Sequence, residues 1–302
     1  MTGRIEVETV VDVSPQPPAT VEASAPAPTS AREPRARTRP RPWGLYLAIA
    51  VVGLALVWAI VPWVFAPGDP LTGTPADKLL PPSAAHWFGT DTLGRDLFGR
   101  VVHGAVNSLS GALIAVTVGL ALGTIVGAVA GAVGGVLDDV LMRIVDVLLA
   151  IPGLLLSLSV IILLGFGTVN AALAVGLGSV AAFARLMRSE VARVRRTEYV
   201  EAAYGSGGTF FAVLRRHVLP NSLTPIVALA ALQFGTAILA ISTLGFLGYG
   251  APPPTPEWGL LIAEGRNYVG TAWWLTALPG LVVVAVVLSA NRISHSLRGS
   301  TR

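Results

Sequence analysis

The feature that most constrains this chain is a series of long apolar stretches with almost no charge. They cover residues 43–65, 105–133, 145–166, 169–183, 223–247 and 273–290. A helix of roughly 20 such residues crosses the hydrocarbon core of a bilayer. Only 13% of the 302 residues are charged, about half the share found in soluble domains. The sequence therefore predicts an all-α polytopic membrane protein with six transmembrane helices.

The composition excludes several kinds of chemistry. The chain has no cysteine, so neither disulfides nor thiolate metal sites can form. The histidines lie too far apart in sequence for a metal-ligand pattern; they are His86, His103, His217 and His295. No Gly-x-x-x-x-Gly-Lys-Ser/Thr loop occurs, so ATP is not bound by that route. We expect a protein that is not an enzyme and that itself holds no catalytic residue, cofactor or metal.

The apolar stretches carry no charged residue near their middle. Carriers driven by protons or sodium usually place ionisable groups at that depth. A stand-alone secondary carrier or channel is therefore disfavoured, although broken helices could still bind sodium through backbone carbonyls.

Two local patterns predict contacts between helices. The second stretch has small residues at a four-residue period, at Gly111, Gly119, Gly123, Gly127 and Gly131. Small residues on one stripe let helices approach closely in lipid, so we interpret the stripe as helix packing rather than a phosphate loop. Further along, Asp139, Arg143 and Asp146 are spaced to pair on one helix face.

The distribution of positive charge predicts the topology. With the N-terminus inside, 17 of the 21 lysines and arginines fall on the inner side, and only Lys78, Arg95, Arg100 and Arg266 fall outside. The positive-inside rule then predicts that both termini are cytoplasmic. Because the arginine positions account for the net charge of +4, no nucleic-acid partner is needed to explain it.

These observations divide the chain into five parts. The first 42 residues are rich in proline, alanine and arginine and predict a disordered tail, which either simply holds the first span's end inside or binds a partner or anionic lipid. The parts are a cytoplasmic tail (1–42), a first transmembrane helix (43–65), an external segment (66–104), a five-helix core (105–291) and a second cytoplasmic tail (292–302).

The longest polar interruption in the second half of the chain runs from Glu198 to Pro220 and reads EYVEAAYGSGGTFFAVLRRHVLP. Its acidic residues come first and its basic residues last, an order that suits a helix dipole, and its glycines supply a bend. The stretch predicts a short helix–turn–helix on the cytoplasmic face that is available to a soluble partner. An ordinary solvated loop remains the alternative from charge and glycine pattern alone.

The letters of this stretch resemble the EAA loop of ABC-importer permeases, whose pattern is Glu-Ala-Ala, three residues, Gly, nine residues, Ile-x-Leu-Pro. The matching positions are Glu201, Ala202, Ala203, Gly207, Leu219 and Pro220. His217 stands where the general pattern has isoleucine, and His217–Asn221, reading HVLPN, resembles the dipeptide/oligopeptide branch. Three further stretches resemble the C-type permease of that branch: GTDTLGRDLFGR (89–100), DDVLMRIVDVLLAIPGLLL (138–156) and LGFLGYGAPPPTPEWGLLIAEGR (244–266).

The resemblance implies an ABC type I importer permease fold with a cytoplasmic coupling helix from Glu198 to Gly207. It implies that Glu201 makes a polar contact with an ATPase subunit, that Ala202 and Ala203 allow close approach, and that Gly207 makes the turn.

The implied partners are a second homologous permease, two ATPase subunits that bind ATP and magnesium, an external solute-binding protein, and membrane lipid. The implied location is the plasma (inner) membrane, and the implied substrates are di- and oligopeptides. Nickel chelates, glutathione or haem are the alternative substrates of this architecture.

Overall fold

The computed structural model describes residues 42–299, which belong to one compact unit, Arg41–Arg302. Apart from Pro42, the predicted disordered tail lies outside the described residues. Within them the structure is nearly all helical, with one isolated β-bridge between Thr90 and Asp96. The predicted all-α architecture is therefore confirmed for this part of the chain.

Five helices are long and apolar enough to cross a membrane, or six spans if one bent helix pair counts as a single span. The five are α1 (Pro42–Ile60), α3 (Leu97–Val133), α6 (Thr168–Arg195), α9 (Leu219–Phe246) and α11 (Trp274–Gly299). The bent pair is α4 (Gly135–Ala150) and α5 (Gly153–Leu164). The helices α3 and α6 are longer than the apolar stretches 105–133 and 169–183, because polar residues at one end of each stretch continue the helix.

The third predicted span differs in shape from the expectation. Instead of one helix with a kink, α4 and α5 meet at an angle of 97°. Pro152 disfavours helical backbone at the residue before it, and Ile151 is accordingly extended, with φ −85° and ψ 127°. The proline therefore ends α4 and makes a corner rather than a kink.

The small-residue stripe of α3 packs against α6, as predicted. A Cβ atom built on Gly123 would lie 2.5 Å from the Cβ atom of Phe183, and one built on Gly127 would overlap the carbonyl oxygen of Ala184. Only glycine lets the two helices approach this closely.

The predicted pairing of Asp139, Arg143 and Asp146 is wrong. Asp146 instead pairs with Arg185 of α6 at 2.5 Å. Asp138, also on α4, forms a bidentate ion pair with Arg188 at 2.6 and 2.7 Å. Because α4 lies against α6, Asp138 and Asp146 pair with arginines of α6 rather than with Arg143 of their own helix.

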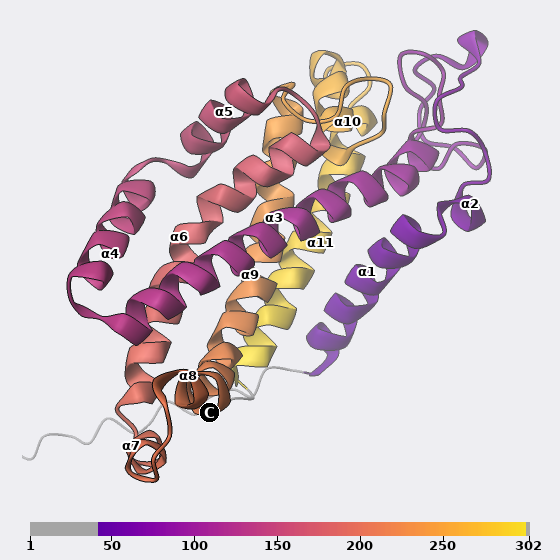
Figure 1. Cartoon of the computed structure of the whole chain (residues 1–302). Coiled ribbons are helices and arrows are strands. Elements are labelled where there is room, and N and C mark those ends of the chain that lie inside the picture. Colours follow the sequence, from indigo (N-terminus) through magenta and orange to yellow (C-terminus); the bar gives the residue numbers. More distant parts are fainter. Residues whose placement is uncertain (1–41, 300–302) are drawn as a thin grey trace, which may run out of the picture. The chain divides into compact units, whose positions relative to one another are not determined.

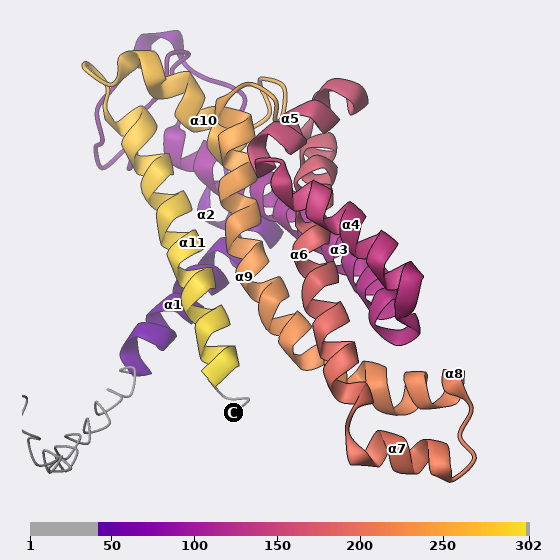
Figure 2. The ribbon, with the colours of Figure 1, turned by 90° about the vertical axis from the view of Figure 1, so that its left-hand side faces the viewer.

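The shorter elements gather at the two ends of the bundle (Figure 1). At one end lie α7 (Glu198–Gly205), α8 (Phe210–Val213) and the π-helical turn η2 (Leu214–Val218). At the other end lie α2 (Pro62–Phe65), the 3-10 turn η1 (Pro75–Asp77), α10 (Trp258–Gly265) and the 3-10 turn η3 (Arg266–Tyr268). Figure 2 shows α7 and α8 projecting side by side beyond the ends of α6 and α9.

Candidate functional site

The candidate site is α7, which forms directly after α6 ends. Thr197 between them is extended, with φ −88° and ψ 144°, and its carbonyl accepts hydrogen bonds from the Val200 and Glu201 amides at 3.0 and 3.2 Å. Glu198 and Glu201 occupy the first turn, where negative charge suits the positive end of the helix dipole. The order of residues in this stretch therefore sets where the helix starts.

The two sides of α7 differ sharply. Val200 is fully buried and Ala203 is partly buried against the hydrophobic core. The side chains of Glu198, Glu201 and Ala202 are exposed. The resulting outer surface combines two carboxylates with a small residue, so a partner can approach the backbone closely there.

The turn after α7 depends on glycine. Gly207 has a φ of +86°, a conformation that favours glycine, and the Gly208 amide donates to the Ala203 carbonyl at 3.0 Å. The chain then reverses into α8, so the predicted helix–turn–helix is present and Gly207 makes its turn.

Leu219 and Pro220, the last positions of the matched pattern, start α9 rather than joining the outer surface of α7. The Leu219 amide donates to the Leu214 carbonyl across the π-helical turn. Pro220 has no amide hydrogen to continue the ladder, and the side chains of Asn221 and Ser222 donate to the carbonyls of His217 and Val218 at 2.7 and 2.9 Å. These two pattern residues therefore fix how the turn joins the span.

The structure thus separates the predicted site residues into two groups. Glu198, Glu201 and Ala202 share the exposed surface of α7, whereas Ala203 and Leu219 face the core. Among the described residues, neither Glu198 nor Glu201 forms an ion pair. The acidic charge of α7 is consequently available to a partner.

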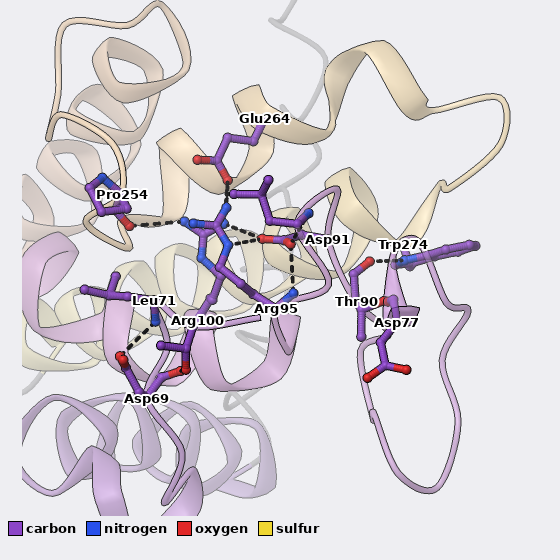
Figure 3. Close-up of polar contacts among 12 residues, drawn as sticks. Asp69, Leu71, Asp77, Thr90, Asp91, Arg95, Arg100, Pro254, Glu264 and Trp274 are labelled. Carbon is purple, nitrogen blue, oxygen red and sulfur yellow. Dashed lines mark hydrogen bonds and ion pairs between the residues drawn. The ribbon is translucent and has the colours of Figure 1, made fainter. Parts of the chain in front are cut away.

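At the opposite end, a buried ion-pair cluster links distant segments (Figure 3). The Nη1 atom of fully buried Arg100 lies 2.9 Å from Asp91 Oδ2 and 2.5 Å from Glu264 Oε2. Arg95 Nε lies 2.6 Å from the same Asp91 oxygen, and Arg100 Nη2 donates to the Pro254 carbonyl at 3.4 Å. The cluster joins the segment before α3 and the first turn of α3 to α10 and the loop that precedes it.

Beside this cluster, Glu257 is completely buried at the start of α10. Its carboxylate accepts hydrogen bonds from the Gly259 and Leu260 amides, both at 2.9 Å, and from Ser108 Oγ at 3.3 Å. Burial raises the pKa of Glu257, and the hydrogen bonds donated by the Gly259 and Leu260 amides oppose that rise.

Sequence reasoning missed both of these features. Their charged residues fall in the stretches 89–100 and 244–266, which carry the family resemblance but predict no contact. The charged residues in these two stretches could have indicated an ion-pair cluster, but neither stretch indicates which distant residue is the partner.

The described residues thus form a bundle with five or six candidate membrane spans. An exposed acidic helix lies at the end opposite the ion-pair cluster. The chain belongs to the family described as binding-protein-dependent transport system inner membrane component, which matches residues 102–299.

Curated relatives resemble the chain over most of its length. The dipeptide transport system permease protein DppC of Alkalihalophilus pseudofirmus is 39% identical, covering 83% of this chain and 84% of that protein. The probable D,D-dipeptide transport system permease protein DdpC of Escherichia coli K12 is 38% identical over the same shares. The glutathione transport system permease protein GsiD of Shigella flexneri is 42% identical over 83% of each chain.

A solved structure of the MetNI methionine ABC transporter, in an inward-facing conformation, shares the fold. It superposes with a TM-score of 0.55 at 19% identity and covers 67% of this chain and 97% of the compared chain. The predicted ABC-importer permease fold is therefore confirmed.

Proposed function

We infer that this permease component belongs to an ATP-driven importer that carries short peptides across the plasma membrane. This proposal rests on two observations taken together. The chain has relatives named for dipeptide transport that cover more than four fifths of its length, and it exposes an acidic docking helix at one end of its bundle.

The driving force is supplied by partners. Two ATPase subunits bind ATP and magnesium, and each permease of a pair offers them one coupling helix. In this chain Glu201 makes the polar contact, while Ala202 at the surface allows close approach. Ala203, Leu219 and Gly207 hold the helix on its span, so that movement of α7 is passed to α6 and α9.

This coupling acts on a two-state bundle. Closure of the ATPase pair pushes the coupling helices, and the bundle passes between inward-facing and outward-facing states. The α7 end lies in the cytoplasm, as do both termini, and the end that carries α10 faces an external solute-binding protein.

A gentle solubilisation followed by mass spectrometry tests the partner set. Recovery of a second six-helix permease together with Walker-motif ATPases supports the importer. Recovery of the chain alone, with uptake by reconstituted vesicles that needs no ATP, would contradict it in favour of a carrier or channel.

A second substrate, glutathione, is favoured by one observation, the 42% identity to GsiD. Glutathione is itself a short peptide, so both candidates demand similar chemistry of the path. Uptake of radiolabelled Ala-Ala, with and without excess glutathione, separates the two: competition by glutathione but not by other tripeptides favours glutathione.

A further inference from the structure

An open cavity of about 220 Å³ lies between four helices, with walls from α3, α5, α6 and α9. Most of its lining is apolar or small. Its polar lining residues are Ser157 of α5, Ser179 of α6, and Gln233 and Thr236 of α9, and none of the lining residues is charged.

Three polar side chains of α9 lie on one face of that helix. Gln233, Thr236 and Thr243 are separated by three and seven residues, and Ala240 stands between the two threonines, so all four point to the same side of an α-helix. Gln233 is 14 residues after the start of α9 and 13 before its end. At a rise of about 1.5 Å per residue, its side chain leaves the helix near the midplane of a bilayer.

An amide at this depth needs a polar partner. Gln233 Oε1 accepts from Thr236 Oγ1 at 3.2 Å, but across the described residues Gln233 Nε2 donates to no group. An amide that faces hydrocarbon without a hydrogen-bond partner is strongly disfavoured. The stripe must therefore face water, a solute or another polar chain rather than lipid.

On the other side of the cavity stands Ser157, which is 4% exposed. Ser179 Oγ donates to the Gly176 carbonyl at 2.8 Å, so its oxygen can still accept a hydrogen bond. The wall thus offers both donors and acceptors, all of them uncharged.

We propose that Gln233, Thr236 and Ser157 form this subunit's half of the translocation path and hydrogen-bond the amide groups of a passing peptide. This inference rests on the proposed function and names the chemistry of its path. Neutral donors and acceptors suit the backbone that all peptides share. Because the wall holds no charge, it does not sort peptides by the charge of their side chains.

The absence of cysteine from the sequence gives a direct test of the path. Single variants Gln233→Cys and Thr236→Cys are assembled with their partners in membrane vesicles and treated with a charged, water-soluble methanethiosulfonate. The control is Val227→Cys, an exposed apolar position about 120° round the helix from Gln233. A thiol reacts as the thiolate, which requires water, so we expect the first two variants to react at least tenfold faster than the control.

A second arm tests the chemistry. Gln233→Glu places a negative charge in the wall, and we expect uptake of Lys-Ala relative to Glu-Ala to rise severalfold over the ratio in the unmodified protein. Thr224→Glu puts the same charge on α9 outside the cavity and leaves the ratio unchanged. If Gln233→Glu does not assemble, the cationic methanethiosulfonate adduct of Thr236→Cys serves instead and shifts the ratio towards Glu-Ala.

The possible outcomes distinguish the translocation path, the contact with peptide and peptide import itself. Reaction of Gln233→Cys and Thr236→Cys no faster than Val227→Cys would overturn the path. An unchanged uptake ratio in an assembled, Ala-Ala-transporting complex would overturn the peptide contact. Fast reaction in a complex that takes up none of the three dipeptides would leave the path standing and refute peptide import instead.

Discussion

The two ends of this bundle handle charge in opposite ways. At the α10 end, Arg100 is fully buried and meets Asp91 and Glu264 within 3 Å. At the α7 end, Glu198 and Glu201 lie exposed without an ion pair among the described residues. The Arg100 cluster thus pairs its charges within the chain, whereas the two carboxylates of α7 face the solvent.

The difference shows how to tell a structural charge from a docking charge. A buried ion must be paired because an unpaired one is strongly destabilising, so the Arg100 cluster determines whether its segments stay together. An exposed carboxylate contributes little to stability, so the fold does not depend on Glu201. Substitutions at the two ends should therefore fail in different assays.

The largest expected effect is on stability at the α10 end. Arg100→Ala removes the fully buried guanidinium that joins Asp91 to Glu264 and leaves Asp91 paired with Arg95 alone, and we expect a loss of about 3 kcal/mol. Thermal unfolding in detergent, followed by circular dichroism, measures it. The control is Arg266→Ala, because Arg266 is exposed at the same end. Equal melting temperatures for both variants would contradict the structural role of the cluster.

Two glycines compare the ends at a smaller scale. Gly94 and Gly207 both have positive φ, +74° and +86°, so alanine at either position costs about 1–2 kcal/mol of strain. A Cβ atom on Gly94 would also overlap the Thr74 carbonyl, whereas one on Gly207 meets nothing within 4 Å. We expect Gly94→Ala to lose about 1–3 kcal/mol more than Gly207→Ala, because only Gly94 is also overpacked. Chemical unfolding of the two purified variants checks this, and the reverse order would show that the α7 turn is the tighter one.

A smaller effect should depend on pH. Burial raises the pKa of Glu257 above its ordinary value of 4.5, so the folded state holds that proton more tightly than the unfolded state. The unfolding free energy contributed by this group therefore falls as pH rises from the ordinary value through the raised one. Melting temperatures measured from acid to neutral pH should show this decline, and Glu257→Gln should flatten it. A slope that Glu257→Gln leaves untouched would assign the pH dependence to another group.

Much of the fold could be predicted because its signals are local. The spans follow from uncharged runs of sufficient length, and the close packing of α3 against another helix follows from its glycine stripe, although the stripe does not name α6 as the partner. The turn at Gly207 follows from glycine itself. The start of α7 follows from the acidic residues that come first in its stretch.

The remaining features depend on partners that are distant in sequence. Arg100 meets Glu264 across 164 positions and Arg188 meets Asp138 across 50, and no local pattern names such a pair. The corner at Pro152 was predicted as a kink, because a proline signals a break without setting its angle. The polar wall was missed because Gln233 and Thr236 are uncharged and stand singly in an apolar run.

In the proposed importer, α7 passes the action of the ATPase to the bundle. The most direct measurement is peptide uptake per ATP hydrolysed in the reconstituted complex, comparing Glu201→Lys with Asp139→Lys. Asp139 is also acidic and exposed, but it lies on α4. Like charges brought together at an interface cost several kcal/mol, so we expect Glu201→Lys to lower this ratio at least about tenfold while the protein still inserts. We expect Asp139→Lys to leave the ratio unchanged. An unaltered ratio in a correctly inserted Glu201→Lys complex would contradict the claim.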